Sequence, residues 1–285
     1  MENNFDCFRL QNGLEIPCLA YGTYQAAETQ DCQTLRLAIE AGYRYFDTAS
    51  FYHTETFVAQ AIRDSGLPRE EFFLTSKAWK TEMGYHAVKA AFQRSLENLN
   101  TEYLDLYLIH WPLPSPDYKD WKALDVETWQ ALEELYREKK VRAIGLSNFL
   151  PHHIENILQH CAIAPMVDQI EFHPGYTQEA TVQYCKMHQI LVQAWSPIGR
   201  GVILQDPLLI ELSEKYGVSP AQICLRFALD RQIIPLPKAS SLKRMQENRD
   251  LFRFKISQED QYRLETMPQI GWSGNHPDRP KVDIS

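Results

Sequence analysis

The stretch "YRYFDTASFYHTE", residues 43–55, shows how this chain of 285 residues is built. It opens with aromatic residues that favour a buried strand, and the apolar run ends at an acid, Asp47. A segment with helical spacing follows at residues 56–65, and a second β-rich run, "FFLTSKAW", at residues 72–79. Strand, helix and strand in this order predict a parallel βαβ unit, because parallel strands need a crossover connection.

The same alternation continues along the whole chain. The β-rich runs are residues 18–24, 43–49, 72–79, 104–110, 141–148, 166–172, 190–197 and 233–239. Segments with helical spacing are residues 31–41, 56–65, 85–99, 128–139, 151–160, 178–188 and 243–251. The absence of an obvious linker predicts one α/β domain over residues 1–285, folded as a (β/α)8 TIM barrel. An open doubly wound sheet is the alternative.

Two further segments stand outside this repeat. Residues 8–17 carry Asn12–Gly13 between β-like flanks, which predicts an N-terminal β-hairpin. Residues 207–230 hold two helical stretches separated by "GVSP". Within that separator, Ser219 followed by Pro220 is typical of an N-cap and a first helical residue.

Composition limits the classes of partner. The net charge of −8 argues against nucleic acid or an anionic membrane as a broad partner. The N-terminus lacks a signal-peptide pattern, and no apolar run is long enough to span a bilayer. The six cysteines are scattered without a C-x-x-C motif, so we expect reduced, mostly buried thiols in a cytoplasmic protein.

Polar residues occur where the predicted strands end. Those at or near a carboxyl end are Asp47, Lys77, His110, Asn148, Ser196 and Lys238, and Gln169 lies inside the sixth strand. Any one of them could be an ordinary solvated rim residue. The carboxyl ends of the strands carry the active site in this kind of barrel, so the set together indicates a functional site.

Several common motifs are absent. No G-x-G-x-x-G follows a strand, and no phosphate-binding P-loop occurs. The segment "GLSNF" at residues 145–149 lacks the final glycine of a nucleophile elbow, so Ser147 is a poor nucleophile candidate. His152 and His153 are adjacent but lack a metal-ligand spacing, and we predict no metal.

Three of these polar residues, Asp47, Lys77 and His110, could act together with Tyr52 on a carbonyl group. Tyr52 is a weak acid with a reference pKa of about 10, and a neighbouring ammonium group, Lys77, would lower that pKa. Asp47 would hold the lysine, and His110 would orient a carbonyl oxygen toward the phenol. The alternatives are structural: a turn cap at Asp47, an Asp47–Lys77 ion pair and rim positions for the other two.

Five segments carry a resemblance to a known family. They are "YRYFDTASFYHTE", "FLTSKAW", "YLDLYLIHWP", "VRAIGLSNF" and "IPLPKAS....R..EN". In this order, and over nearly the whole chain, they resemble the aldo-keto reductases. The segments "AWSPIGRG" and "GNHPDRP" look most like the bacterial branch that includes the 2,5-diketogluconate and methylglyoxal reductases.

The resemblance implies an activity and a site. It implies a barrel with a C-terminal tail over its active-site rim, usually a monomer, that reduces small aldehydes and ketones with NADPH by direct hydride transfer. Tyr52 matches the family's general acid, and Asp47, Lys77 and His110 match its partners. The walls of the substrate pocket correspond to Tyr24, Phe51, Trp79 and Trp111, with Trp272 closing it.

The implied cofactor residues fall into groups. Ser147, Asn148 and Gln169 match the contacts to the nicotinamide carboxamide, and Trp195 the aromatic stacked on its ring. Ser196, Ile198 and Gly199 match the pyrophosphate loop. Lys238, Ser241, Arg244 and Asn248 match the adenosine contacts. An arginine in the first turn of a helix suits a phosphate, which predicts a preference for NADPH over NADH.

The chain departs from the family pattern at four positions. Thr54 replaces asparagine, Ala239 replaces serine or threonine, and Trp195 replaces tyrosine. Lys139 replaces a common glycine, at a cost of about 1 kcal/mol if the turn needs a positive φ. Two other function classes stay open: a non-catalytic NADPH-binding sensor or structural protein, and a barrel enzyme of other chemistry such as an isomerase.

Overall fold

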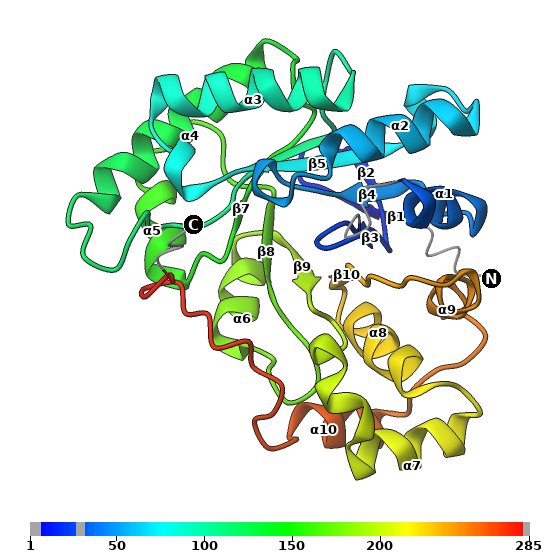
Figure 1. Ribbon diagram of the computed structural model, residues 1–285. Helices are drawn as coiled ribbons and strands as arrows, with labels where there is room; N and C mark the ends of the chain where they lie inside the picture. The colour runs from blue at the N-terminus through cyan, green and yellow to red at the C-terminus, as the bar shows by residue number, and fades with distance from the viewer. Residues whose placement is uncertain (1–6, 27–31, 282–285) are drawn as a thin grey trace.

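The computed structural model describes residues 7–26 and 32–281. Its main sheet has eight parallel strands in chain order, β3 to β10 (Figure 1). They are β3 (Tyr21–Gly22), β4 (Tyr45–Asp47), β5 (Phe73–Ala78), β6 (Leu106–Ile109), β7 (Ile144–Ser147), β8 (Val167–Glu171), β9 (Leu191–Trp195) and β10 (Ile234–Pro235). Each strand lies within one predicted run, so the predicted α/β class is confirmed.

The first and last strands of this sheet meet. Ala20 N donates to Pro235 O at 3.2 Å, and Gly22 N donates to Pro237 O at 3.1 Å. A Cβ atom at Gly22 would lie 3.0 Å from Leu236 O, so the glycine permits this close approach of two backbones. The sheet is therefore the predicted barrel, and the alternative of an open doubly wound sheet is wrong.

Helices follow the strands and surround the sheet (Figure 1). They are α1 (Gln33–Glu40), α2 (Glu55–Ser65), α3 (Tyr85–Leu99), α4 (Trp121–Arg137), α5 (Pro151–Leu158), α6 (Glu179–Met187), α7 (Pro207–Tyr216), α8 (Pro220–Asp230), α9 (Leu242–Arg249) and α10 (Gln258–Glu265). Short 3-10 helices are η1 (Ser50–Tyr52), η2 (Arg69–Glu71), η3 (Lys80–Glu82) and η4 (Gly199–Gln205). Over the described ranges, no helix has both the length and the apolar character needed to cross a membrane.

Two helices differ from the prediction. α4 begins at Trp121 and not at residue 128, and the polar helix α10 was not predicted. The start of the expected helix 31–41 lies at residue 31, outside the described residues. Before α8, Ser219 and Gln222 form the predicted N-terminal cap, with Ser219 Oγ accepting from Gln222 N.

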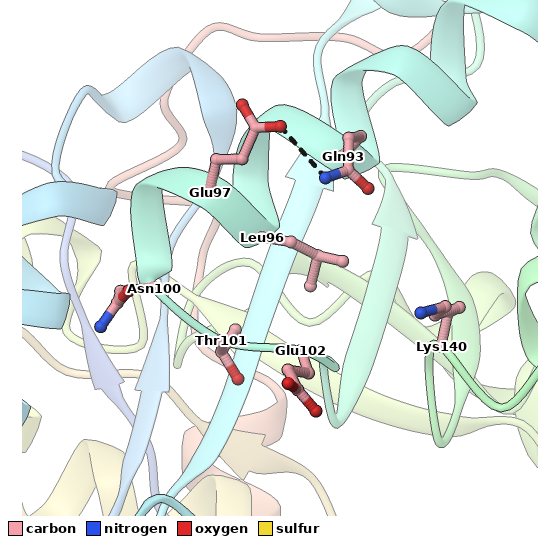
Figure 2. A pocket seen from close by; sticks show the side chains of 7 residues that line it. All are labelled: Gln93, Leu96, Glu97, Asn100, Thr101, Glu102 and Lys140. Atoms are coloured by element: carbon pink, nitrogen blue, oxygen red, sulfur yellow. Dashed lines mark hydrogen bonds between the residues drawn. The ribbon is translucent and has the colours of Figure 1, made fainter.

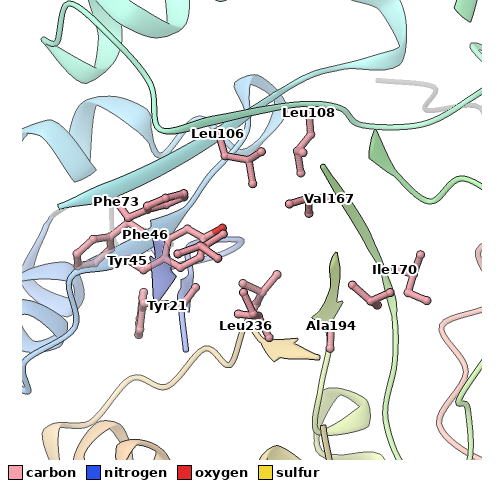
Figure 3. Close-up of a cluster of buried hydrophobic side chains, with 14 of the residues drawn as sticks. Tyr21, Tyr45, Phe46, Phe73, Leu106, Leu108, Val167, Ile170, Ala194 and Leu236 are labelled. Carbon is pink, nitrogen blue, oxygen red and sulfur yellow. The ribbon is translucent and has the colours of Figure 1, made fainter. Parts of the chain in front are cut away.

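The strands direct alternate side chains to the barrel interior and to the surrounding helices. On β4, Tyr45 and Asp47 reach residues on the opposite side of the barrel, whereas Phe46 packs against Phe72. Figure 3 shows this core, with Tyr45, Phe73, Leu106, Val167 and Leu236 among its members. The polar residues of the interior are therefore set in a tightly packed apolar frame.

The predicted hairpin is present, as β1 (Cys7–Arg9) paired with β2 (Glu15–Pro17). Its turn donates from Gln11 Nε2 to Pro165 O and from Asn12 Nδ2 to Arg142 O. These carbonyl groups precede β8 and β7, so the hairpin covers the N-terminal ends of the strands.

An open hollow of about 630 Å³ lies between α3 and the starts of β6 and β7 (Figure 2). Its lining is mixed polar and apolar: Gln93, Leu96, Glu97, Asn100, Thr101, Glu102 and Lys140. Residues 100–102 lead into the N-terminal end of β6, and Lys140 precedes β7. The hollow is thus at the end of the barrel opposite the predicted active-site rim.

The C-terminal tail crosses that rim after α10 (Figure 1). Ser273 donates to both carboxylate oxygens of Glu171, the last residue of β8, at 2.9 Å from N and 2.7 Å from Oγ. Further along, Asp278 Oδ1 lies 2.9 Å from His152 Nε2 on α5. These two attachments hold the tail where the resemblance implied it.

The cysteines agree with the sequence prediction of mostly buried thiols. Cys18, Cys32, Cys185 and Cys224 are buried, Cys161 is half-buried, and Cys7 is exposed. Burial raises the pKa of the Cys185 and Cys224 thiols, so both are neutral and unreactive near pH 7.

Candidate active site

The four predicted catalytic residues converge at the carboxyl ends of three neighbouring strands. Asp47 ends β4, Lys77 is next to last in β5, and His110 follows β6 directly. Tyr52 ends the short helix η1, which the chain enters after β4. The Tyr52 hydroxyl lies 3.4 Å from Lys77 Nζ and 3.4 Å from His110 Nε2.

Lys77 is held by two oxygen atoms in a fully buried position. Its ammonium donates to Asp47 Oδ1 at 2.6 Å and to the carbonyl oxygen of Thr48 at 3.0 Å. Burial lowers the pKa of Lys77, and the Asp47 carboxylate opposes this by favouring the charged form. The ion pair therefore keeps a cation beside the phenol in a site with little water.

Burial raises the pKa of Tyr52 well above its usual value, and the charge of Asp47 adds to the increase. The prediction that the pKa of Tyr52 is lowered toward neutral pH is wrong, although the Lys77 ammonium by itself favours the phenolate. The reason is that Asp47 offsets the field of the lysine, so desolvation of the phenolate dominates. Tyr52 is therefore protonated at neutral pH, the state that a proton donor needs.

His110 is neutral in this site. Its burial, with the nearby charges of Lys77 and Lys80, lowers the pKa of His110 well below the ordinary range. The ring meets Trp79 edge to face at 4.9 Å between centroids. Nδ1 has no hydrogen-bond partner among the described residues, so Nε2 is the nitrogen placed to act beside the phenol.

A second group of residues adjoins the first on β7, β8 and β9. Asn148 Nδ2 donates to the carbonyl oxygen of His110 at 2.9 Å, and Trp195 Nε1 donates to Asn148 Oδ1 at 2.8 Å. Ser147 Oγ donates to Gln169 O at 2.9 Å, and Gln169 Nε2 donates to Asp47 Oδ2 at 2.7 Å. The residues expected to hold a nicotinamide are thus linked to Asp47 and His110 by hydrogen bonds.

The expected phosphate residues lie around the start of α9. Ser241 caps this helix, and Arg244 donates from Nε to Ser241 Oγ and from Nη2 to Ser240 Oγ. Lys238 and Arg244 pair with no carboxylate in the described part of the chain, whereas Lys243 lies near Glu247 and Arg253 pairs with Asp250. Asn248 is buried on the same helix. Free N–H groups and two cations without acidic partners make this helix start suitable for an anion.

The pyrophosphate loop predicted after β9 is tightly folded. Gly199 N donates to Ser196 O at 2.8 Å. Ser196, Gly199 and Arg200 all have positive φ values, with Ile198 between them. Turns that contain left-handed residues of this kind form anion-binding concavities in many proteins, so the loop suits a phosphate group.

Aromatic rings form one wall beside Tyr52. Phe51 stacks on Trp79 at 3.8 Å between centroids, and Tyr24 lies 5.1 Å from the Tyr52 ring. Trp111 is buried next to His110 in the chain. Trp272 instead stacks on Tyr176 at 6.1 Å, a partner that sequence reasoning missed, and has no ring contact with Tyr52 within the described ranges.

Thr54 and Glu171 also have roles that the sequence did not reveal. Thr54 Oγ1 lies 2.9 Å from the hydroxyls of both Thr23 and Thr48, so this departure from the family pattern ties together the backbone around Asp47. Glu171 anchors the tail through Ser273. Neither role leaves a signal in the sequence, since each depends on a contact across the fold.

His152, His153 and Asp278 place possible metal ligands within 4.8 Å of one another. Their hydrogen bonds favour another role. His153 Nδ1 accepts from Leu150 N at 3.1 Å, so the proton of the neutral ring is on Nε2, which faces Asp278 at 3.0 Å. That nitrogen offers no lone pair to a metal, and the cluster suits an attachment of the tail to α5.

Comparison with known proteins places the chain among enzymes. Residues 19–267 match the model of the "Aldo/keto reductase family". A 9,11-endoperoxide prostaglandin H2 reductase of Trypanosoma cruzi is 43% identical over 98% of this chain and 97% of its own length. A glyoxal reductase of Bacillus subtilis is 42% identical over 96% of both chains.

Solved structures of aldo-keto reductases also have the fold of this chain. An aldo-keto reductase of the silkworm Bombyx mori, crystallised with NADPH, superposes with a TM-score of 0.85 at 31% identity, covering 94% of this chain and 89% of that one. With the family model spanning most of the sequence and two relatives above 40% identity over nearly full length, this chain belongs to the aldo-keto reductases, a family of oxidoreductases.

Proposed function

We propose that this protein reduces small aldehydes and ketones to alcohols with NADPH, by direct hydride transfer. The observation that carries the proposal is the position of the Tyr52 hydroxyl, 3.4 Å from both Lys77 Nζ and His110 Nε2 beside an aromatic wall. A binding protein has no need of a buried, protonated phenol beside a lysine–aspartate pair. The relatives that reduce glyoxal and methylglyoxal support a carbonyl substrate.

The protein's own residues supply the proton and hold the oxygen. The neutral His110 donates from Nε2 to the carbonyl oxygen and sets it in line with the phenol. Tyr52 then transfers its proton to that oxygen while a hydride reaches the carbonyl carbon, so both hydrogen atoms of the new alcohol are accounted for. Lys77 stabilises the phenolate that remains, and Asp47 keeps the lysine in place.

NADPH supplies the hydride when bound, and the described residues fit it. Trp195 is fixed through its indole N–H and offers a flat face for the nicotinamide, with Ser147, Asn148 and Gln169 as partners for the carboxamide. The loop of Ser196, Ile198 and Gly199 suits the pyrophosphate. Lys238, Ser241, Arg244 and Asn248 suit the adenosine end, where two cations lack acidic partners within the described residues.

The aromatic wall determines which substrates can approach. Tyr24, Phe51, Trp79 and Trp111 present apolar faces beside His110, with Trp272 at the tail. Such a wall excludes water from the reacting atoms, while Tyr52 and His110 provide the polar contacts that orient a carbonyl group.

A turnover assay tests the proposal. The purified protein is mixed with NADPH and, in turn, methylglyoxal, glyoxal, an aromatic aldehyde, a keto-sugar and a steroid ketone, and the loss of NADPH absorbance is followed. We expect reduction of at least one of these carbonyls with equal amounts of NADPH consumed and alcohol formed. Tight NADPH binding without turnover of any substrate would favour the sensor alternative, and the absence of NADPH binding would favour other barrel chemistry.

A further inference from the structure

A line of buried polar side chains crosses the barrel interior from the catalytic carboxylate. Gln169 on β8 donates from Nε2 to Asp47 Oδ2 at 2.7 Å and to Gln193 Oε1 at 3.0 Å. Gln193 on β9 donates from Nε2 to the Tyr45 hydroxyl at 2.8 Å, and Tyr45 Oη lies 2.9 Å from Thr75 Oγ1. Gln193, Tyr45 and Thr75 have no solvent-exposed surface.

The directions of the hydrogen bonds made by the two glutamines follow from the Asp47 carboxylate at one end. Asp47 is paired with Lys77 and can only accept, so the Gln169 amide must direct its nitrogen to Asp47. The same nitrogen bonds Gln193, which must therefore accept with its oxygen and donate with its nitrogen. Tyr45 accepts that bond, and its hydroxyl shares a hydrogen bond with Thr75 Oγ1 in which either oxygen can donate.

This order of donors and acceptors constrains Gln169. Both amide hydrogens of Gln169 are used inside the barrel, one on Asp47 and one on Gln193. Its Oε1 atom is left as the acceptor for another group, and a carboxamide N–H is such a donor. The amide cannot rotate to present its nitrogen instead without losing both bonds.

The position of Gln193 is unusual for the interior of this fold. Bulky apolar side chains dominate the packed layers inside (β/α)8 barrels. A glutamine buried there would cost free energy unless both of its polar ends were bonded, as they are here. Val167 on β8 and Leu236 just after β10, from the two strands beside β9, belong to the apolar core drawn in Figure 3.

We propose that Gln193 is a positioning residue for the reaction. It fixes the amide of Gln169 so that Oε1 faces the cofactor carboxamide and Nε2 holds Asp47 Oδ2, and the second bond in turn fixes the carboxylate that orients Lys77. The inference rests on the proposed NADPH-dependent reduction. Gln193 itself touches none of Asp47, Lys77, Tyr52 or His110 through any hydrogen bond in the described structure, and it acts through Gln169.

The test compares Q193M with Q193E. Methionine has a similar length but neither accepts nor donates, so we expect the NADPH Kd to rise roughly fivefold to tenfold, the effect of about one hydrogen bond. We expect kcat to fall in addition, because Asp47 loses a fixed partner. A buried glutamic acid is protonated near pH 6 and reproduces both bonds of glutamine, so Q193E should bind NADPH within about twofold of the wild type there.

A double-mutant cycle separates positioning from general damage to the fold. If Gln193 acts through Gln169, the effect of Q193M on the NADPH Kd should disappear in a Gln169→Met background. An effect of equal size in both backgrounds would overturn the proposal, and so would a folded Q193M with the wild-type Kd and kcat. If Q193M does not fold, Q193N replaces it in the cycle. Asparagine keeps the polar amide, but its shorter side chain cannot reach Gln169 to form the hydrogen bond.

The binding measurement also keeps this inference distinct from the proposed function. Fluorescence titration with NADPH reports the Kd without any carbonyl substrate. A wild-type protein that binds NADPH but reduces no carbonyl would contradict the proposed function. The double-mutant cycle, measured as the NADPH Kd, would still decide whether Gln193 acts through Gln169.

Discussion

Tyr52 combines two features that act in opposite directions. Burial raises its pKa, which keeps the proton on the phenol through neutral pH. The Lys77 ammonium at 3.4 Å stabilises the phenolate that remains after proton transfer. Reduction needs the protonated phenol and alcohol oxidation needs the phenolate, so reduction should proceed at neutral pH and oxidation should increase as the pH rises.

Replacing Tyr52 by phenylalanine tests the proton donor. The variant keeps the ring and its contact with Tyr24 but loses the hydroxyl, so we expect kcat for carbonyl reduction to fall by at least about 100-fold. The NADPH Kd should change little, since Tyr52 makes none of the proposed cofactor contacts. Steady-state kinetics and a fluorescence titration measure the two quantities. Wild-type turnover in this variant would exclude Tyr52 as the acid.

Replacing Lys77 by methionine tests the stabilisation of the phenolate. Without the ammonium the pKa of Tyr52 should rise further, so the pH profile of residual alcohol oxidation should move to higher pH and reduction should slow strongly. The change also leaves Asp47 buried without a counter-charge. An Asp47→Asn, Lys77→Met double variant removes both charges and serves as the control. An unmoved profile with normal rates would mean that the ion pair is structural.

Replacing Arg244 by alanine tests the phosphate site. The guanidinium suits the 2′-phosphate that NADPH has and NADH lacks, so the KM for NADPH should rise by roughly tenfold or more while kinetics with NADH barely change. Lys243→Ala is the matched control, because Lys243 is exposed on the same turn and lies near Glu247. Equal effects on both cofactors, or a wild-type preference for NADH, would contradict the assignment.

At the scale of elements, the end of α4 shows how one residue affects a helix. Lys139 has φ +60°, and the bonds from Lys139 N to Tyr136 O and from Lys140 N to Leu135 O form a Schellman motif. The turn therefore needs the positive φ that the family's usual glycine adopts without strain. Lysine adopts it here at a cost in free energy.

Replacing Lys139 by glycine should therefore raise the free energy of unfolding by about 0.5–1 kcal/mol. Gly66, which ends α2 with φ +68° and has nothing within 4 Å of an added Cβ, provides the reverse control. Gly66→Ala should lower stability by about 1 kcal/mol, because only the backbone conformation opposes it. Urea unfolding of both variants measures the changes. A Lys139→Gly variant no more stable than the wild type would show that the turn is unstrained.

The elements were predictable where local pattern determined them. Every strand of the main sheet fell within a predicted run because buried strands are rich in β-formers, and α8 began at its predicted cap. The start of α4 was missed because its buried apolar stripe begins only at Trp129, whereas Trp121, Leu124 and Val126 before it are half-buried. α10 was missed because only Asp260 and Leu264 of this polar helix are buried, and its position depends on tertiary contacts such as Lys215 with Asp260.

For the whole molecule, the two ends of the barrel have separate roles. The hairpin covers the N-terminal ends of the strands, and the candidate active site and the tail lie at the other end. The sequence predicted a group of polar residues at the carboxyl ends of the strands, because these residues occurred where strands ended, but it did not predict which end the hairpin covers. It did not predict the raised pKa of Tyr52 or the bonds of Gln193, since both depend on burial and on contacts across the barrel.

The attachment of the tail can be tested by Ser273→Ala. The variant removes the Oγ donor at 2.7 Å and leaves a buried oxygen of Glu171 with one partner fewer, a loss of about 1–3 kcal/mol for the docked tail. We expect faster amide hydrogen exchange in residues 271–281 and no change in the barrel strands. Mass spectrometry after exchange measures both. Unchanged exchange in the tail would show that Asp278 and its histidines suffice to hold it.

The meeting of β3 and β10 has a consequence for how the protein is made. A ribosome releases the first strand long before its last partner exists, because Ala20 bonds to a carbonyl group at Pro235. One edge of β3 therefore stays unpaired in the nascent chain until translation is almost complete. Contacts between residues so distant in sequence also form slowly. The hydrogen bond between Gln193 and Tyr45 also forms late, because Gln193 lies on β9. Catalytic competence should therefore arrive in a single late step of biosynthesis, and a polypeptide stalled before its ninth or tenth strand would be inactive.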